Sequence, residues 1–193
     1  KCIYGRDLLK GKKVIVSAGG TQEKIDPVRY ISNRSSGRQG YAIAKAAWME
    51  GADVTLVSCT TALPAPYGVK MVYVQDAREL EKAMNAEYDS CDAAIMAAAV
   101  SDYRPTVQAD QKIKKEDFDS LHIDLTQNPD ILYGLGQKKR GQFLVGFAAE
   151  TQDVIEHGKS KLKRKNLDML VANDVAMPGA GFNGTTNIAS LLY

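Results

Sequence analysis

A loop rich in Asn, Ser and Gly, "SNRSSGRQG" at residues 32–40, directly precedes a stretch of small residues with helical spacing. The first turn of a helix leaves backbone N–H groups without intrahelical partners, and the helix dipole adds positive charge there, so this position favours a phosphate or a carboxylate. The alternative is an ordinary capped helix with Ser35 or Ser36 as its N-cap. Asn33 lies ahead of both serines and has no capping duty, so we expect its side chain to be free to meet a ligand.

Small and polar residues also follow two apolar runs that we expect to be strands. Gly19 and Gly20 follow the first run, and Ser101, Asp102 and Tyr103 follow an alanine-rich run. Ligands of doubly wound sheets bind beyond the carboxyl ends of the strands, so these are candidate site positions. Asp102 could bind a cation, accept a hydrogen bond from a ligand hydroxyl or cap the next turn, and its spacing does not separate the three.

Two basic segments could meet a polyphosphate. In "KSKLKRK", Lys161 and Lys165 are four residues apart and therefore share one face of the expected helix. Lys112 begins a second segment, "KIKK". A solvated run of charge is the commoner explanation of either segment taken alone.

The elements that must position these residues alternate along the chain. Helical spacing appears at 40–51, 76–88, 128–139 and 151–166, and runs of strand type appear at 12–20, 52–58, 69–75, 92–100, 121–125, 142–150, 167–174 and 186–193. Asp76 is the expected N-cap of one helix, and Pro129 is expected in the first turn of another. The alternation predicts a Rossmann-like, doubly wound α/β fold with a mostly parallel sheet and helices on both faces. We expect residues 1–193 to form a single domain.

Composition excludes several classes of function. The 25 Lys and Arg residues against 23 Asp and Glu give a net charge of +2, too small for a protein that binds nucleic acid through its phosphates. No apolar run approaches the ~18 residues of a membrane span. Three separated cysteines support neither a disulfide framework nor a zinc site and fit a reducing cytoplasm. The G-x-G-x-x-G motif and the acidic residue that would hold a dinucleotide's ribose are both absent, which disfavours NAD.

Seven collinear motifs, taken together, resemble the phosphopantothenoylcysteine synthetase family of coenzyme A biosynthesis, in the bacterial form fused behind a flavin-dependent decarboxylase domain. They are "SAGGTQEKIDPVRYISNRSSGRQGYAIAKAA", "AAAVSDYRP", "KIKK", "NPDIL", "VGFAAET", "KLKRKNLDMLVAND" and "GFN", and they cover nearly the whole chain. The resemblance implies that residues 1–12 are a linker or a remnant. It also implies that the decarboxylase domain and the family's closing strand and helix lie outside this chain.

The resemblance implies a ligase that joins 4'-phosphopantothenate to L-cysteine. CTP activates the pantothenate carboxylate as an acyl-cytidylate with loss of pyrophosphate, and the cysteine amine then displaces CMP with the help of Mg²⁺. A carboxylate is a poor electrophile, so it needs such a leaving group, a cation and donors near the acyl oxygen. An ATP-dependent version of the ligase, an NAD(P) or flavin oxidoreductase, and a nucleotide-binding module without turnover remain alternatives.

By position, the resemblance also implies roles for single residues. Asn33 contacts the acyl-cytidylate and Lys112 covers it from a mobile loop, which makes these two the catalytic candidates. Arg29 reaches the substrate from the other subunit of a homodimer. Ala98 and Asp102 line the substrate pocket, and Asp102 is also the metal candidate. The positions expected around the nucleotide are Gly19, Gly20, Ser35, Gly37, Ser101, Asp102, Tyr103, Lys112, Phe147, Lys161 and Lys165.

The sequence departs from the family pattern at two places. "GGT" stands where "GPT" is frequent, and "SDY" stands where "ADY", "ADW" or "ADF" is common. Neither change removes a side chain assigned to chemistry. Ser101 and Tyr103 are expected at the cytosine, so the serine alters base recognition.

Overall fold

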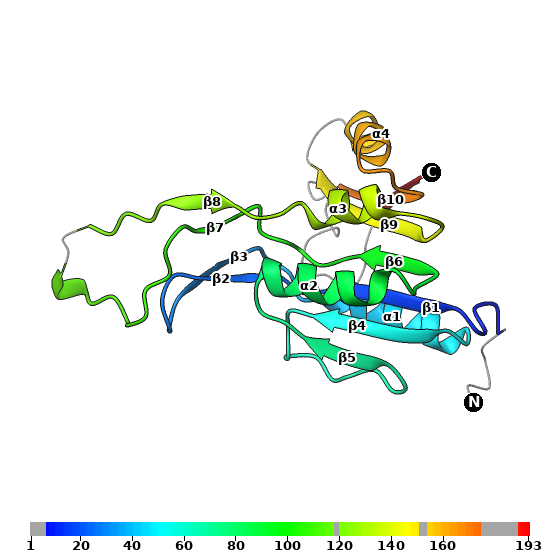
Figure 1. Ribbon diagram of the computed structural model, residues 1–193, viewed down its shortest axis with the longest axis horizontal. Helices are drawn as coiled ribbons and strands as arrows, with labels where there is room; N and C mark the ends of the chain where they lie inside the picture. Colours follow the sequence, from blue (N-terminus) through cyan, green and yellow to red (C-terminus); the bar gives the residue numbers. More distant parts are fainter. Residues whose placement is uncertain (1–6, 118–119, 151–153, 175–188) are drawn as a thin grey trace.

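A seven-stranded sheet forms the centre of the protein in a computed structural model that describes residues 7–117, 120–150, 154–174 and 189–193 (Figure 1). The strand order is β11-β10-β9-β6-β1-β4-β5, and the pairs are parallel except for β10 with β11. The strands are β1 (Lys13–Ala18), β4 (Asp53–Ser58), β5 (Lys70–Tyr73), β6 (Ala93–Met96), β9 (Phe143–Glu150), β10 (Met169–Asp174) and β11 (Ala189–Leu192). This is the order of doubly wound dinucleotide-binding sheets with one antiparallel strand added at the edge, which confirms the predicted fold.

Helices cover both faces of this sheet. On one face, α1 (Arg38–Met49) buries Tyr41, Ala44 and Ala47 against the valines and leucine of β1 and β4. On the other face, α2 (Ala77–Tyr88) and α3 (Ile131–Lys138) bury Leu80, Met84 and Leu135, and α4 (Val154–Arg164) adds Leu162 to the same cluster. The central strands are therefore apolar on both sides, as their continuous hydrophobic runs predict.

Two short antiparallel pairs project beyond the carboxyl ends of the central strands and form an arm (Figure 1). The pairs are β2 (Gln22–Lys24) with β3 (Tyr30–Ser32), and β7 (Tyr103–Pro105) with β8 (Leu125–Gln127). A short 3-10 helix, Lys115–Asp117, lies in the connection between β7 and β8. The predicted strand at 121–125 is wrong except for its last residue, because pairing with β7 places the strand at 125–127, outside the main sheet.

The helix starts correct two predictions and confirm a third. The N-cap of α1 is Gly37, at φ 75° and without a side-chain cap bond, so neither Ser35 nor Ser36 caps the helix. A Cβ at Gly37 would lie 2.8 Å from Thr60 Cγ2, which explains the glycine. Pro129 precedes the N-cap of α3, which is Asp130, and so lies outside the first turn. Asp76 caps α2 as predicted and accepts from the Glu79 N–H at 2.8 Å.

Two features noted in the sequence can be compared with the structure only as far as the described residues extend. Within the described part of the chain, no helix is both long enough and apolar enough to span a membrane. The "GFN" motif at 181–183 lies outside the described residues.

Candidate functional site

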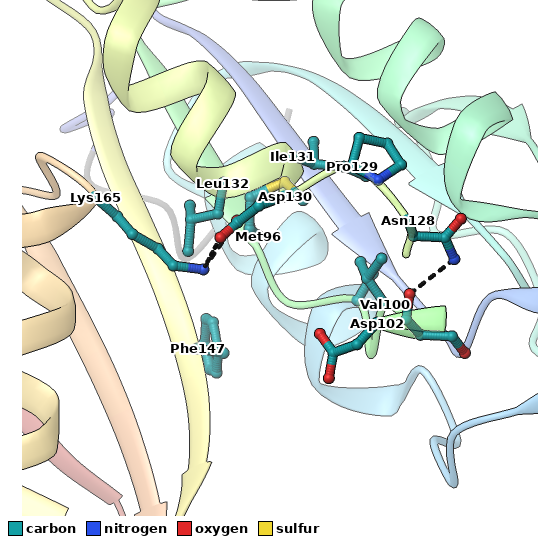
Figure 2. Close-up of a pocket in the computed structure, with 12 residues that line it drawn as sticks. Met96, Val100, Asp102, Asn128, Pro129, Asp130, Ile131, Leu132, Phe147 and Lys165 are labelled. Atoms are coloured by element: carbon teal, nitrogen blue, oxygen red, sulfur yellow. Dashed lines mark hydrogen bonds and ion pairs between the residues drawn. The ribbon is translucent and has the colours of Figure 1, made fainter. Parts of the chain in front are cut away.

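A pocket of about 230 Å³ lies at the carboxyl ends of β6 and β9 (Figure 2). Four parts of the chain meet there: the end of β6 with the loop after it, the start of α3, Phe147 on β9, and Lys165 after α4. The lining residues are Met96, Ala98, Val100, Ser101, Asp102, Asn128, Pro129, Asp130, Ile131, Leu132, Phe147 and Lys165. The structure thus brings together five residues that the sequence singled out: Ala98, Ser101, Asp102, Phe147 and Lys165.

An ion pair lies at one side of this pocket. The Lys165 ammonium lies 2.8 Å from Oδ2 of Asp130, and Oδ1 of Asp130 also accepts from the Tyr133 N–H as the cap of α3 (Figure 2). Lys165 follows the last residue of α4, and its backbone N–H donates to the Lys161 carbonyl at 2.9 Å. Lys161, by contrast, is not among the lining residues. The cation at the pocket is therefore Lys165, with Lys161 one turn earlier.

Asn128 fixes the loop after β6 against the start of α3. Its side-chain amide donates to the Ser101 carbonyl at 2.8 Å, and its backbone N–H donates to the Asp102 carbonyl at 2.8 Å. The Ser101 N–H in turn donates to Thr21 Oγ1 at 3.0 Å. The Ser101 hydroxyl is buried, and no partner for it is present among the described residues. An unsatisfied buried polar group of this kind costs about 1–3 kcal/mol.

A group of loop residues lies next to the pocket where the strand order reverses, between β1 and β6. The Asn33 side-chain amide donates to the carbonyl of Val100 at 3.0 Å, so the expectation that this side chain is free is wrong. Gly20 bridges to Ala99, and a Cβ at Gly20 would lie 2.6 Å from the Asn33 carbonyl oxygen. Val100 lines the pocket, so the Asn33 loop lies at the edge of the pocket.

The remaining glycine and serine candidates lie at the turn after β1 and at the start of α1. A Cβ at Gly37 would lie 3.3 Å from the backbone nitrogen of Gly19, which shows how closely the two backbones approach. The Ser35 hydroxyl accepts from the Gly37 N–H at 3.4 Å. Backbone packing alone accounts for the glycines, so a role toward a ligand is additional to this structural one.

Three predicted residues lie on the arm, away from the pocket lining. Tyr103 belongs to β7 and is 48% exposed. Lys112 is exposed in the connection between β7 and β8. The Arg29 guanidinium binds Asp26 of its own chain, with Nε 2.9 Å from Oδ2. The described chain therefore does not bring Arg29 or Lys112 to its own pocket, and contact across a dimer stays a prediction.

The residues present fit one metal-binding arrangement. No cluster of three or more His, Cys, Asp or Glu side chains that could hold a metal occurs in the described ranges. Asp102 and Asp130 both line the pocket, and Asp130 is paired with Lys165. Mg²⁺ is commonly held by one or two carboxylates together with substrate phosphates. Asp102 fits that arrangement as a single protein ligand.

Sequence reasoning missed the contribution of α3. The "NPDIL" motif stood out, but no role was attached to Asn128, Asp130 or Ile131. A usable signal was present, because an Asn-Pro-Asp sequence ahead of an apolar helical run predicts a helix start, and a helix start is suited to an anion.

The fold and the pocket define a doubly wound α/β domain with its candidate site at the carboxyl ends of the central strands. The chain belongs to the family described as the DNA/pantothenate metabolism flavoprotein C-terminal domain, whose model matches residues 9–193.

Individual relatives agree with this assignment. The coenzyme A biosynthesis bifunctional protein CoaBC of Vibrio cholerae is 50% identical over 192 residues, which is 98% of this chain and 48% of that protein. The chain thus spans about half the length of the curated relatives it matches. A crystal structure of the C-terminal domain of a CoaBC protein has a TM-score of 0.79 at 42% identity, covering 95% of this chain and 82% of that one. A Cab2 variant in complex with phosphopantothenate-cysteine has a TM-score of 0.71, covers 84% and 72% of the two chains, and at 17% identity shows the fold alone.

Proposed function

We propose that this chain is a ligase that joins 4'-phosphopantothenate to L-cysteine and uses CTP to activate the carboxylate. The single observation that carries the proposal is the pocket, in which residues of four distant motifs meet: Ala98, Asp130, Phe147 and Lys165. The names of the relatives, which are bifunctional proteins of coenzyme A biosynthesis, support it. Because those relatives are about twice as long, we also propose that a decarboxylase domain accompanies this one.

The proposed reaction has two steps, activation of the carboxylate and formation of the amide. In the first, a carboxylate oxygen of phosphopantothenate attacks the α-phosphorus of CTP, and the bond to pyrophosphate breaks. In the second, the cysteine amine attacks the acyl carbon, the bond to CMP breaks, and the amine loses a proton. Each step develops negative charge on oxygen, so fixed donors and cations near those atoms lower its barrier.

The pocket residues suit the nucleotide. Lys165 can exchange Asp130 for a phosphate, and the start of α3 presents backbone N–H groups to the same region. The Phe147 ring lines the pocket and offers an apolar surface to a base. Mg²⁺ held by Asp102 would neutralise triphosphate charge and assist the departure of pyrophosphate.

The loop at the edge of the pocket suits the acyl group. Asn33 lies beside Val100 at the edge of the pocket, where a carboxylate attacking the α-phosphorus of a pocket-bound nucleotide would approach. Arg29 and Lys112 lie on the projecting arm rather than at this pocket. This arrangement favours a homodimer in which the arm of one subunit completes the site of the other.

Pyrophosphate release measured in separate reactions tests the proposal. We expect release with CTP, phosphopantothenate and Mg²⁺ before cysteine is present, and CMP and ligated product only after cysteine is added last. Equal or faster release with ATP would overturn the choice of CTP. Release that does not require phosphopantothenate, or no release with either nucleotide, would overturn the ligase itself. Lys163→Ala, at an exposed position on α4, is the matched control for pocket variants.

A further inference from the structure

Asp26 is a buried carboxylate at the turn between β2 and β3, with 1% of its surface exposed. Its Oδ1 accepts the backbone N–H groups of Val28 and Arg29, both at 2.8 Å, which closes the turn on itself. Its Oδ2 accepts from the Arg29 guanidinium, with Nε at 2.9 Å. The Arg29 guanidinium is the main reason that the pKa of Asp26 lies far below its usual range, and the backbone donors lower the pKa further.

The same carboxylate also reaches a segment more than eighty residues later. Oδ2 of Asp26 accepts the Ile113 N–H at 3.2 Å, and Nη2 of Arg29 donates to the Ile113 carbonyl at 2.7 Å. Four residues earlier, the Ala109 N–H donates to the Ile25 carbonyl at 2.9 Å. Lys112 is exposed and lies between these two attachment points.

These contacts are more than the turn itself requires. Oδ1 alone satisfies the local N–H groups, whereas Oδ2 and the Arg29 guanidinium bind each other and each also binds the Ile113 backbone. A buried carboxylate left without partners would be costly, and the Arg29 guanidinium and the Ile113 N–H are the partners of Oδ2. The Asp26 carboxylate consequently holds the turn at 25–29 and the segment at 109–113 together.

We infer that Asp26 is a positioning residue that fixes the Arg29 guanidinium and the Lys112 segment to each other, so that both cations reach the anionic substrate as one unit. The inference rests on the proposed ligase function, which assigns Arg29 to the substrate and Lys112 to the acyl intermediate. Asp26 itself contacts neither the substrate nor the intermediate, and acts only by positioning Arg29 and Ile113.

Hydrogen exchange and steady-state kinetics of Asp26→Asn in the full chain test this inference. The amide keeps an acceptor for the turn but loses the charge that holds Arg29 and Ile113. We expect backbone exchange at 109–113 to speed up about tenfold or more, a factor equivalent to about 1.4 kcal/mol. We expect kcat to fall while the KM for CTP stays nearly unchanged, because the nucleotide pocket lies elsewhere.

Asp92→Asn is the matched control. Asp92 also accepts a backbone N–H, that of Lys13 at 2.8 Å, and also pairs with a cation, Lys12 at 2.9 Å. It lies next to β6 in the main sheet and makes none of the arm contacts, so exchange at 109–113 and the kinetics should match the wild type. If Asp26→Asn does not fold, Arg29→Lys keeps the charge but loses the planar fork that bridges Asp26 to Ile113. It should speed exchange in the same segment.

Three results decide between the inference and its rivals. Unchanged exchange at 109–113 in a folded Asp26→Asn protein overturns the link between the turn and the Lys112 segment. Faster exchange with unchanged kcat leaves Asp26 as a purely structural residue and overturns its positioning role. A wild type without ligase turnover overturns the proposed function and the positioning role that rests on it, while the exchange comparison still decides whether Asp26 holds the segment.

Discussion

The Nζ of Lys165 lies 2.8 Å from the Oδ2 of Asp130, so the cation that follows α4 meets the carboxylate that caps α3 at the side of the pocket. The two residues are 35 positions apart in sequence, and only the packing of α3 and α4 on the same face of the sheet brings them together. Under the proposed function, an incoming phosphate would compete with Asp130 for this ammonium. The pair holds Lys165 at the side of the pocket in this structure.

Lys165→Ala should weaken CTP binding by about 1–3 kcal/mol, as expected for a hydrogen bond to a charged group. Lys161→Ala should weaken it too, but less, because Lys161 is not among the pocket-lining residues. Loss of the ion pair with Asp130 should cost the fold less than about 1 kcal/mol, since such pairs contribute little near the surface. Titration calorimetry with CTP checks this, and Lys163→Ala should bind as the wild type does. Wild-type CTP affinity in both Lys161→Ala and Lys165→Ala would mean that this segment is a solvated run of charge with no role in nucleotide binding.

Asn33→Ala should give a folded protein that binds CTP nearly normally but makes little product. The pocket residues that would hold the nucleotide are untouched, whereas a donor at the reacting acyl group is lost, and removal of one such donor lowers kcat by about 10²–10³. Single-turnover assays of pyrophosphate and product formation measure this. Asn85→Ala removes an amide that bonds the Glu81 carbonyl on α2, and should leave kcat unchanged. Turnover of Asn33→Ala at the wild-type rate would remove Asn33 from the mechanism.

Much of the fold followed from local patterns, but the site followed only in part. The continuous apolar runs of β1, β4, β6 and β9 predict a buried parallel sheet, and Asp76 is a correct cap prediction because capping depends on near neighbours. The arm was missed because its strands are three residues long and carry little periodicity. The Asn33 bond to Val100 and the Asp26 bond to Ile113 join residues 67 and 87 positions apart, and spacing along the chain does not reveal such contacts.

Gly20→Ala and Gly40→Ala should separate activity from stability. A Cβ at Gly20 would lie 2.6 Å from the carbonyl oxygen of Asn33 in an exposed loop, which can shift. A displacement of the loop by about 1 Å would lower the rate about 10²-fold, and because the clash is with backbone it would also cost some stability. A Cβ at Gly40 would lie 2.6 Å from the Ala18 Cβ in the core, so that variant should lose about 1–3 kcal/mol of stability.

Urea unfolding and ligase assays on the same samples measure the two effects. Gly134→Ala on α3 is the control, because no atom lies within 4 Å of a Cβ built there. It should be neutral, or more stable by up to about 1 kcal/mol from helix propensity. A Gly20→Ala protein that loses stability but keeps its rate would contradict the placement of the Asn33 loop at the reacting group.

Cys59 should be unreactive toward thiol reagents in the folded protein at pH 8. Burial is the main reason that its pKa rises to about 12, and the negative charge of Glu23 adds to the effect, while burial likewise raises the pKa of Cys91 to about 11. The thiolate is the nucleophile, so at pH 8 almost none of either side chain is in the reactive form. Labelling of a Cys2→Ser variant with a disulfide reagent checks this: we expect slow labelling of the folded protein and labelling of both thiols in denaturant.

Cys59→Ala should keep its kcat, because the proposed reaction takes its cysteine from the substrate. Rapid labelling of the folded protein, or loss of turnover in a stable Cys59→Ala variant, would instead make this thiol part of the chemistry.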